Sequence, residues 1–230
     1  MKSPTRPIAT INEGPLHAAL KQWYAQPGDL VEVPMHGRQI DLVRGELLIE
    51  IQTAGFSALR KKLPALLERR PVRLVHPVAV QRWIVRVEGR QLKVLGRRKS
   101  PKQGRLEDAF SEIVSLSQIL SHPNFSLEIL LTHEDEVRRH VPNRAWRRKG
   151  WVTAERRLIS VVSSHVFGGP RDFLRLLPAT MPKSFTTLDV AEQLSVPRGL
   201  AQKIAYCLRF AGAIRLDGKR GNAMVYRMED

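Results

Sequence analysis

Residues 38–52, RQIDLVRGELLIEIQ, are the stretch that decides the fold, because their pattern is typical of a β-hairpin. Two runs of alternating apolar and polar residues flank Arg44-Gly45, a pair that suits a tight turn. With these two residues as the loop, Leu42 pairs with Leu47. Side chains of a strand alternate between its two faces. The hairpin is therefore expected to direct one set of apolar residues toward a core: Ile40, Leu42, Leu47, Ile49 and Ile51.

The opposite face of the predicted hairpin carries three polar side chains, those of Asp41, Glu50 and Gln52. In this register Asp41 lies diagonal to Glu50, with roughly 7 Å or less between their Cβ atoms. Two carboxylates at that separation can share one hard cation through oxygen ligands. An amphipathic surface hairpin shows the same alternation, so spacing alone leaves metal binding and a plain surface hairpin both open.

The segments around the hairpin predict a mixed order of helices and strands. A helix is expected over residues 13–25 and a strand over 30–35 before the hairpin. A helix over 56–70, kinked at Pro64, and strands over 72–75 and 83–87 follow it. Farther on, an amphipathic helix is expected over 106–120.

This order, with Asp in the first arm of the hairpin and Glu-x-Gln in the second, resembles the PD-(D/E)xK nuclease superfamily over roughly residues 12–88. The resemblance implies a restriction-endonuclease-like α-β-β-β-α-β core, an α/β (α+β) fold. It implies that Asp41 and Glu50 bind Mg²⁺ or Mn²⁺, with the Ile51 carbonyl as a further ligand. It also implies that Gln52 positions the attacking water and that Glu13 matches an acidic residue of the first helix.

Two positions depart from the family pattern. Ile40 precedes Asp41 where Pro is usual, and Gln52 stands where Lys is usual. A neutral amide can hydrogen-bond a water molecule but adds no positive charge near a phosphate. Some members of the superfamily carry Gln at this position, and others place a substitute lysine on the following helix.

Three consecutive basic residues on the 56–70 helix are candidates for that substitution or for contact with DNA. Arg60 and Lys62 flank the apolar stripe of the helix, and either is predicted to replace the missing lysine. Lys61 points away from the stripe and is predicted to contact DNA, as is Arg60. Phosphate contact or plain solvation is the alternative for all three residues.

Two other titratable residues have simpler interpretations. His17 lies one helical turn from Glu13, so a second metal ligand or a proton-transfer role is open, but a packed or exposed helix histidine is favoured. Cys207 is the single cysteine, which excludes an internal disulfide framework and a cysteine-based zinc ribbon. It falls in an apolar helix and is expected to be buried.

The charge of the chain points to a polyanion as its partner. The 230 residues include 38 Lys and Arg against 22 Asp and Glu, a net charge of +16. Residues 51–100 hold 13 basic and 2 acidic residues, directly after the two carboxylates. We therefore expect a phosphate-binding surface around the candidate metal site, with a solvated charged face as the alternative. No apolar run approaches the roughly 18–20 residues of a membrane span, so a cytoplasmic location without a membrane partner is expected.

The C-terminal part of the chain predicts a winged helix. A helix over 153–166 leads to helices over 188–194 and 197–211, and then to two strands around a glycine-rich loop over 217–223. Candidate DNA-binding residues lie on the second helix of the pair and in the loop: Arg198, Gln202, Lys203, Lys219 and Arg220. A winged helix that contacts protein is the alternative.

Four segments and one leading function follow from these patterns. We expect a flexible arm over 1–12, a nuclease-like domain over 13–135, a basic tryptophan-containing connector over 136–152 and a winged helix-turn-helix domain over 153–230. The predicted function is a Mg²⁺- or Mn²⁺-dependent endonuclease that hydrolyses DNA, and a homodimer stays open. The alternatives are a non-catalytic DNA-binding regulator or recruitment factor with a degenerate nuclease-like core, and an RNA-acting nuclease.

Overall fold

A computed structural model describes residues 13–35, 37–89 and 92–229 and shows a mixed α/β (α+β) architecture with one large sheet and few helices. The arm expected over residues 1–12 lies outside the described part of the chain. None of the helices in the described part is long and apolar enough to cross a membrane.

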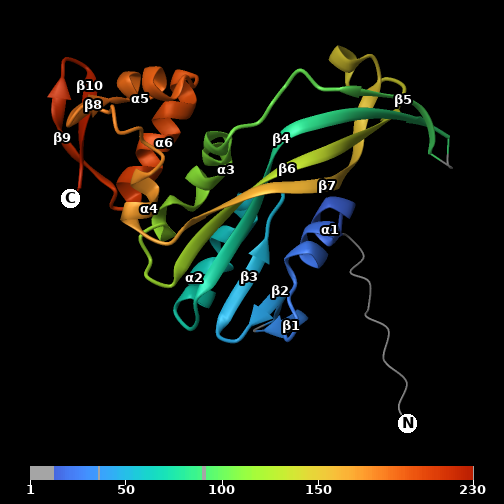
Figure 1. Cartoon of the computed structure of the whole chain (residues 1–230), viewed down its shortest axis with the longest axis horizontal. Helices are drawn as coiled ribbons and strands as arrows, with labels where there is room; N and C mark the ends of the chain where they lie inside the picture. Colours follow the sequence, from blue (N-terminus) through green and yellow to red (C-terminus); the bar gives the residue numbers. More distant parts are fainter. Residues whose placement is uncertain (1–12, 36, 90–91, 230) are drawn as a thin grey trace, which may run out of the picture.

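The large sheet contains seven strands in the described residues and is mixed (Figure 1). Its order is β1-β2-β3-β4-β6-β7, and β5 pairs with the far half of β4. The pairs β3–β4 and β4–β6 are parallel, whereas β1–β2, β2–β3, β4–β5 and β6–β7 are antiparallel. The strands are β1 (Leu30–Met35), β2 (Arg38–Arg44), β3 (Leu47–Ile51), β4 (Val72–Glu88), β5 (Lys93–Lys99), β6 (Phe125–His140) and β7 (Trp151–Phe167).

Both faces of the sheet are covered near its middle. Helix α1 (Pro15–Tyr24) packs on one face, where Leu16 and Leu20, one turn apart, meet Leu42 and Ile49 of the hairpin. The other face is covered by short helices: η1 (Phe56–Arg60), α2 (Leu63–Leu67), η2 (Leu106–Ala109), α3 (Phe110–Ile113) and η3 (Val114–Ile119). The hairpin is thus buried from two sides.

The helix predicted over 56–70 is divided into η1 and α2. Pro64 lies in the first turn of α2, where its missing N–H has no helical partner to lose. The break therefore falls before Pro64 rather than as a kink within one helix. The helix predicted over 106–120 is likewise divided, into η2, α3 and η3.

The prediction of a helix over 153–166 was wrong, because these residues belong to strand β7. The pairing of β7 with β6 contains three register shifts. Each shift changes the phase of the strand's alternation, so the sequence loses the period of two that identifies a strand. The expected domain boundary at residue 153 falls inside β7, and the expected 136–152 connector contains the end of β6 and the start of β7.

The C-terminal unit, residues 170–228, has its own three-stranded sheet with the order β8-β10-β9. The order of helix pair and hairpin matches the expectation, but β9 continues to Arg220, so Lys219 and Arg220 lie at a strand end rather than in a long loop. Thr186 is the N-cap residue of α5, and its hydroxyl accepts hydrogen bonds from the N–H groups of Leu188 and Asp189. The elements are α4 (Pro170–Leu174), β8 (Ser184–Thr186), α5 (Thr187–Leu194), α6 (Arg198–Phe210), β9 (Ile214–Arg220) and β10 (Ala223–Met228).

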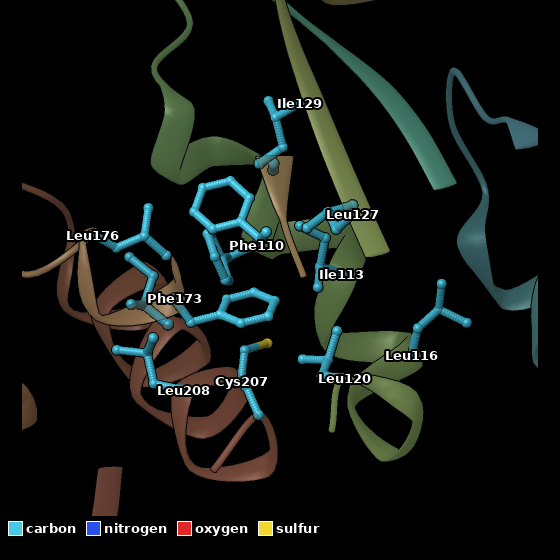
Figure 2. Packing of buried hydrophobic residues seen from close by; sticks show 14 of the residues in the cluster. Phe110, Ile113, Leu116, Leu120, Leu127, Ile129, Phe173, Leu176, Cys207 and Leu208 are labelled. Atoms are coloured by element: carbon cyan, nitrogen blue, oxygen red, sulfur yellow. The ribbon is translucent and has the colours of Figure 1, made fainter. Parts of the chain in front are cut away.

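One hydrophobic cluster joins the C-terminal unit to the large sheet. Figure 2 shows Phe110 and Ile113 of α3 facing Phe173 and Cys207, with Leu127 of β6 behind them. Cys207 is fully buried, as expected, and burial raises the pKa of its thiol to about 12. The C-terminal unit is therefore packed on the sheet layer through a continuous apolar core.

Removal of the Phe110 ring should destabilise both parts together. Phe110→Ala is expected to lower the free energy of unfolding by about 3–5 kcal/mol, because the side chain is fully buried. Chemical denaturation should show one cooperative transition in the native protein and in the variant. Leu188→Ala, at a side chain that is 52% exposed, is the control and should change stability by less than about 0.5 kcal/mol. Two separate transitions in the native protein would contradict a shared core.

Candidate functional site

The β2–β3 hairpin positions Asp41 and Glu50, although its register differs from the predicted one by two residues. Val43 pairs with Leu48 and Leu42 with Ile49, so the turn is Gly45-Glu46. Gly45 has a φ of +54°, a conformation that glycine adopts without strain. Continuing this register by one step sets Asp41 opposite Glu50 rather than diagonal to it. A shift of two residues does not by itself change the face on which a side chain lies.

The strict alternation of the hairpin fails at Asp41. Ile40 belongs to the core beneath the short helices, whereas Leu42 belongs to the core beneath α1. Between them, Asp41 Oδ2 accepts a hydrogen bond of 2.8 Å from the backbone N–H of Ile51. The prediction that Ile40 shares one apolar face with Leu42, Ile49 and Ile51 was therefore wrong. The reason is that the Asp41 side chain, rather than a backbone carbonyl, accepts the N–H of Ile51, which interrupts the strand ladder at this point.

Helix α1 supplies a row of charged groups to Asp41. His17 Nε2 lies 3.2 Å from Asp41 Oδ2, and its other ring nitrogen contacts the Glu13 carboxylate. One turn farther along, Lys21 Nζ lies 2.7 Å from Glu13 and 2.6 Å from Glu32. The charges therefore alternate in sign along a series of contacts from Glu32 through Lys21, Glu13 and His17 to Asp41.

The pKa of His17 is raised from 6.5 to about 9. Burial of the ring lowers this pKa, but hydrogen bonds and charge attraction from Asp41 and Glu13 outweigh burial. The imidazole is therefore protonated at neutral pH and bridges two carboxylates.

Glu50 is the most deeply buried group of the site, at 5% exposed. Its Oε1 lies 2.5 Å from Lys62 Nζ, and Lys62 also donates a hydrogen bond of 2.7 Å to the carbonyl of Gln39. Burial raises the pKa of Glu50 to about 7, with Asp41 adding to the rise and Lys62 opposing it. Of the three basic candidates on this segment, the structure brings Lys62 to Glu50.

The other predicted residues of this region have different partners. The Gln52 side chain donates to the carbonyl of Ala54, so it turns toward the local loop. Arg60 Nε donates a hydrogen bond of 2.8 Å to the carbonyl of Ser115, and Lys61 is exposed. None of these three side chains has a contact with Asp41 or Glu50 in the described part of the chain.

The predicted DNA-binding residues of the C-terminal unit form a separate surface. Arg198, Gln202 and Lys203 are exposed on α6, and Lys219 and Arg220 are exposed at the end of β9. Figure 1 shows these elements at the opposite end of the molecule from α1. They do not contribute to the carboxylate site.

Three residues of the site were missed or discounted in the sequence: His17, Lys21 and Glu32. His17 and Lys21 follow Glu13 at intervals of four, a spacing that places all three on one helix face. That signal was present in the sequence, whereas the arrival of Glu32 from β1 depends on the tertiary fold. Among the described residues, no group of three or more His, Cys, Asp or Glu side chains is arranged to hold a metal ion.

The charge of His17 should make stability depend on pH. Because the pKa of His17 is raised from 6.5 to about 9, its protonated ring stabilises the fold by roughly 3 kcal/mol at most. This stabilisation is fully present below pH 6.5 and is lost as the pH rises through 9. Unfolding measured from pH 6 to 10 should therefore show a steeper decline for the native protein than for His17→Gln. His165→Gln, at a histidine without a carboxylate partner in the described residues, should keep the native slope. Parallel curves for the native protein and His17→Gln would contradict this assignment.

Comparisons with known proteins match one family and one relative, over different lengths of the chain. The family described as "Domain of unknown function (DUF8091)" matches residues 14–168, which end one residue after β7. A protein of Treponema pallidum (strain Nichols), described as an uncharacterized protein, is 30% identical over 226 residues, covering 96% of this chain and 88% of the relative. No solved structure matches. The family match covers more than half of the chain, so the protein belongs to the DUF8091 family.

Proposed function

We propose that the protein is a metal-dependent nuclease that hydrolyses DNA phosphodiester bonds at Asp41 and Glu50. The observation that carries the proposal is the Lys62 ammonium 2.5 Å from the buried Glu50 carboxylate, with Asp41 near enough for its charge to act on that carboxylate. Two carboxylates with one lysine are the groups that the PD-(D/E)xK pattern requires. Lys62 compensates for Gln52 at the usual lysine position.

The order of elements supports the same proposal. Helix α1, strands β1 to β3, the η1–α2 segment and strand β4 follow one another as α-β-β-β-α-β. Strand β4 then pairs in parallel with β3, and Glu50 lies opposite Leu74. This is the order expected from the resemblance, although β4 is a single long strand rather than two short ones.

The carboxylates suit a hard divalent cation. Asp41 and Glu50 offer oxygen ligands, and Glu50 Oε1 is a buried atom without a hydrogen bond in the described residues, its contact being the ion pair with Lys62. Asp41 and Glu50 would hold Mg²⁺ or Mn²⁺, which would supply a water of lowered pKa and stabilise negative charge on the phosphate. The Ile51 carbonyl is the further ligand implied by the resemblance.

Lys62 and His17 contribute positive charge to this site. Lys62 is partly buried, so its ammonium acts in a region of low polarity where charge interactions are strong. It is placed to stabilise the charge that develops on a phosphate oxygen. His17 holds Asp41 through its protonated ring, so a cation and this proton compete for the same carboxylate oxygen.

We assign a DNA-binding role to the C-terminal unit. Its order of α5, α6 and the β9–β10 hairpin is that of a winged helix, and α6 exposes Arg198, Gln202 and Lys203 on the face opposite its buried residues. Tyr206 and Arg209 continue this exposed face. The surface would contribute affinity for DNA without taking part in chemistry.

A non-catalytic DNA-binding protein is the second candidate, and one observation favours it. Both carboxylates carry internal cations, since His17 contacts Asp41 and Lys62 contacts Glu50. An acidic pair neutralised in this way is also a stable structural arrangement. The two candidates differ in whether a divalent cation can displace these partners.

A cleavage assay with Mg²⁺ or Mn²⁺ on plasmid and single-stranded DNA distinguishes the candidates. Asp41→Asn and Glu50→Gln should abolish cleavage, and Lys62→Ala should slow it by about 10²–10³-fold, the cost of removing one charge-stabilising donor. Lys183→Ala is the control, because this exposed lysine lies outside the predicted catalytic and DNA-binding residues. It should cleave within about twofold of the native rate.

Two results would overturn the nuclease proposal. DNA that is bound but intact at every metal concentration would assign the chain to the non-catalytic class. Cleavage that persists in Asp41→Asn and Glu50→Gln would place the chemistry elsewhere. Labelled RNA in the same assay tests the RNA-acting alternative.

A further inference from the structure

Most of the net charge of the chain lies on one extension of the large sheet. We call it the distal arm: residues 81–102 and 133–157, which include β5 and the far ends of β4, β6 and β7. Figure 1 shows it reaching away from the C-terminal unit. Its described residues include 15 Lys and Arg and five Asp and Glu, so they carry +10 of the total +16.

The excess cations of the distal arm have no carboxylate partner among the described residues. Four of its five acidic residues bind six arginines in ion pairs. The other nine basic side chains have no carboxylate within 4 Å in the described part of the chain: Arg86, Lys93, Arg98, Lys99, Lys102, Arg139, Arg144, Arg147 and Lys149. All nine are exposed, which leaves them available to an anionic partner.

Aromatic rings lie among these charges. Arg97 lies over the Trp83 ring at 4.7 Å and Arg86 over the Trp151 ring at 4.8 Å, so both guanidinium groups are held against the sheet. Trp146 is different, because it lies in the β6–β7 connection and is 81% exposed. Arg147 lies over this indole at 5.0 Å, and because 81% of the side chain is exposed, the ring still offers a face on which an unpaired base can stack.

A cavity at the base of the arm adjoins the cavity of the candidate site. It has a volume of about 490 Å³ and is lined by Arg82, Lys102, Arg148 and Arg156 of the arm and by Thr53 after β3. Thr53 also lines the cavity that contains Glu13, His17 and Asp41. Arg156 joins the two regions, since it donates a hydrogen bond of 3.0 Å to the carbonyl of Thr53. A polyanionic strand on the arm would therefore have a cationic path toward the carboxylates.

Three carboxylates, those of Asp108, Glu112 and Glu136, line that cavity against its four cations, which leaves a small excess of positive charge. Asp108 accepts the backbone N–H of Arg105, and Glu136 is bound by Arg138 at 2.8 Å and by the Thr153 hydroxyl at 2.7 Å. Arg82 Nε is a buried donor without a hydrogen bond in the described residues, and it lies 3.9 Å from Glu134 Oε2, with which it forms an ion pair.

We propose that the distal arm binds a single strand of nucleic acid, with its cations on the phosphates and Trp146 stacked on an unpaired base. The inference rests on the proposed function for the class of partner, but not on cleavage. A duplex is disfavoured as the main partner of Trp146, because the faces of paired bases are covered by their neighbours. Basic residues on an edge strand also prevent pairing between sheets, and this is the competing explanation for β5.

Binding measured without divalent cations tests the arm apart from the chemistry. Fluorescence anisotropy with a labelled single strand and with a hairpin duplex, in EDTA, should show tighter binding of the single strand. Trp146→Ala should weaken single-strand binding by roughly 5- to 100-fold and leave the duplex nearly unchanged, whereas Trp146→Phe should retain stacking. Circular dichroism checks that each variant is folded.

A charge series supplies the second measurement. Lys93→Gln/Arg98→Gln/Lys99→Gln should lower the slope of log affinity against log salt by about 2, since each lost phosphate contact of a single strand removes about 0.7. Arg171→Gln/Arg175→Gln/Lys183→Gln removes the same charge from exposed positions of the C-terminal unit and should leave the slope nearly unchanged.

Three results would overturn the proposal. The first is native affinity in both the arm triple variant and Trp146→Ala, which would leave protection of the sheet edge as the role of β5. The second is an equal loss in the two triple variants, which would indicate general electrostatics. The third is binding to vesicles of anionic lipid without binding to the single strand. If the strand binds as expected but no DNA is cleaved in the metal assay, the proposed nuclease function fails and the arm assignment stands.

Discussion

The buried carboxylate of Glu50 is the constraint on which the candidate site depends. An ionised carboxylate inside a protein requires a cation or a proton, because its desolvation is otherwise too costly. Lys62 supplies the cation, and the pKa of about 7 shows that burial still favours the proton. Lys62 is held in place by packing, since the neighbouring Leu63 and the preceding Phe56 are fully buried in the core of the sheet. The geometry of the ion pair is thus a consequence of how the chain covers the sheet after β3.

The sequence predicted the hairpin, but neither its register nor the break in its alternation at Asp41. A shift of two residues preserves alternation, whereas a shift of one would have reversed the two faces. The approach of a basic side chain to Glu50 was also predictable, because the basic run that contains Lys62 directly follows the hairpin in sequence. His17 was discounted because a helix histidine near one acid is common. Its second partner, Asp41, becomes visible only when α1 packs across the sheet.

The long strands could not be predicted, and the reason is physical. Strand β4 has a register shift between Ala79 and Gln81, and the β6–β7 pairing has three. Each extra residue changes the face on which the following side chains lie, so a 17-residue strand appears as two short ones or as a helix. Bulges form where neighbouring strands require them, and a single strand's sequence does not contain that information. The error moved the predicted domain boundary into β7.

The long strands also determine where the positive charge lies. From the sequence, the basic run over 51–100 was expected to surround the carboxylates. In the structure, the second half of the basic run lies on the far part of β4 and on β5, away from the carboxylates, so Arg97, Arg98 and Lys99 lie on the distal arm.

At the opposite end of the molecule, the core around Phe110, Phe173 and Cys207 holds the C-terminal unit in place (Figure 2). Because this core packs the C-terminal unit against the sheet layer, α6 and the arm do not act as modules on a flexible tether. A ligand gains from both surfaces only if it is long enough to span the molecule, so the length of a bound strand, rather than local concentration, should decide whether their contributions combine.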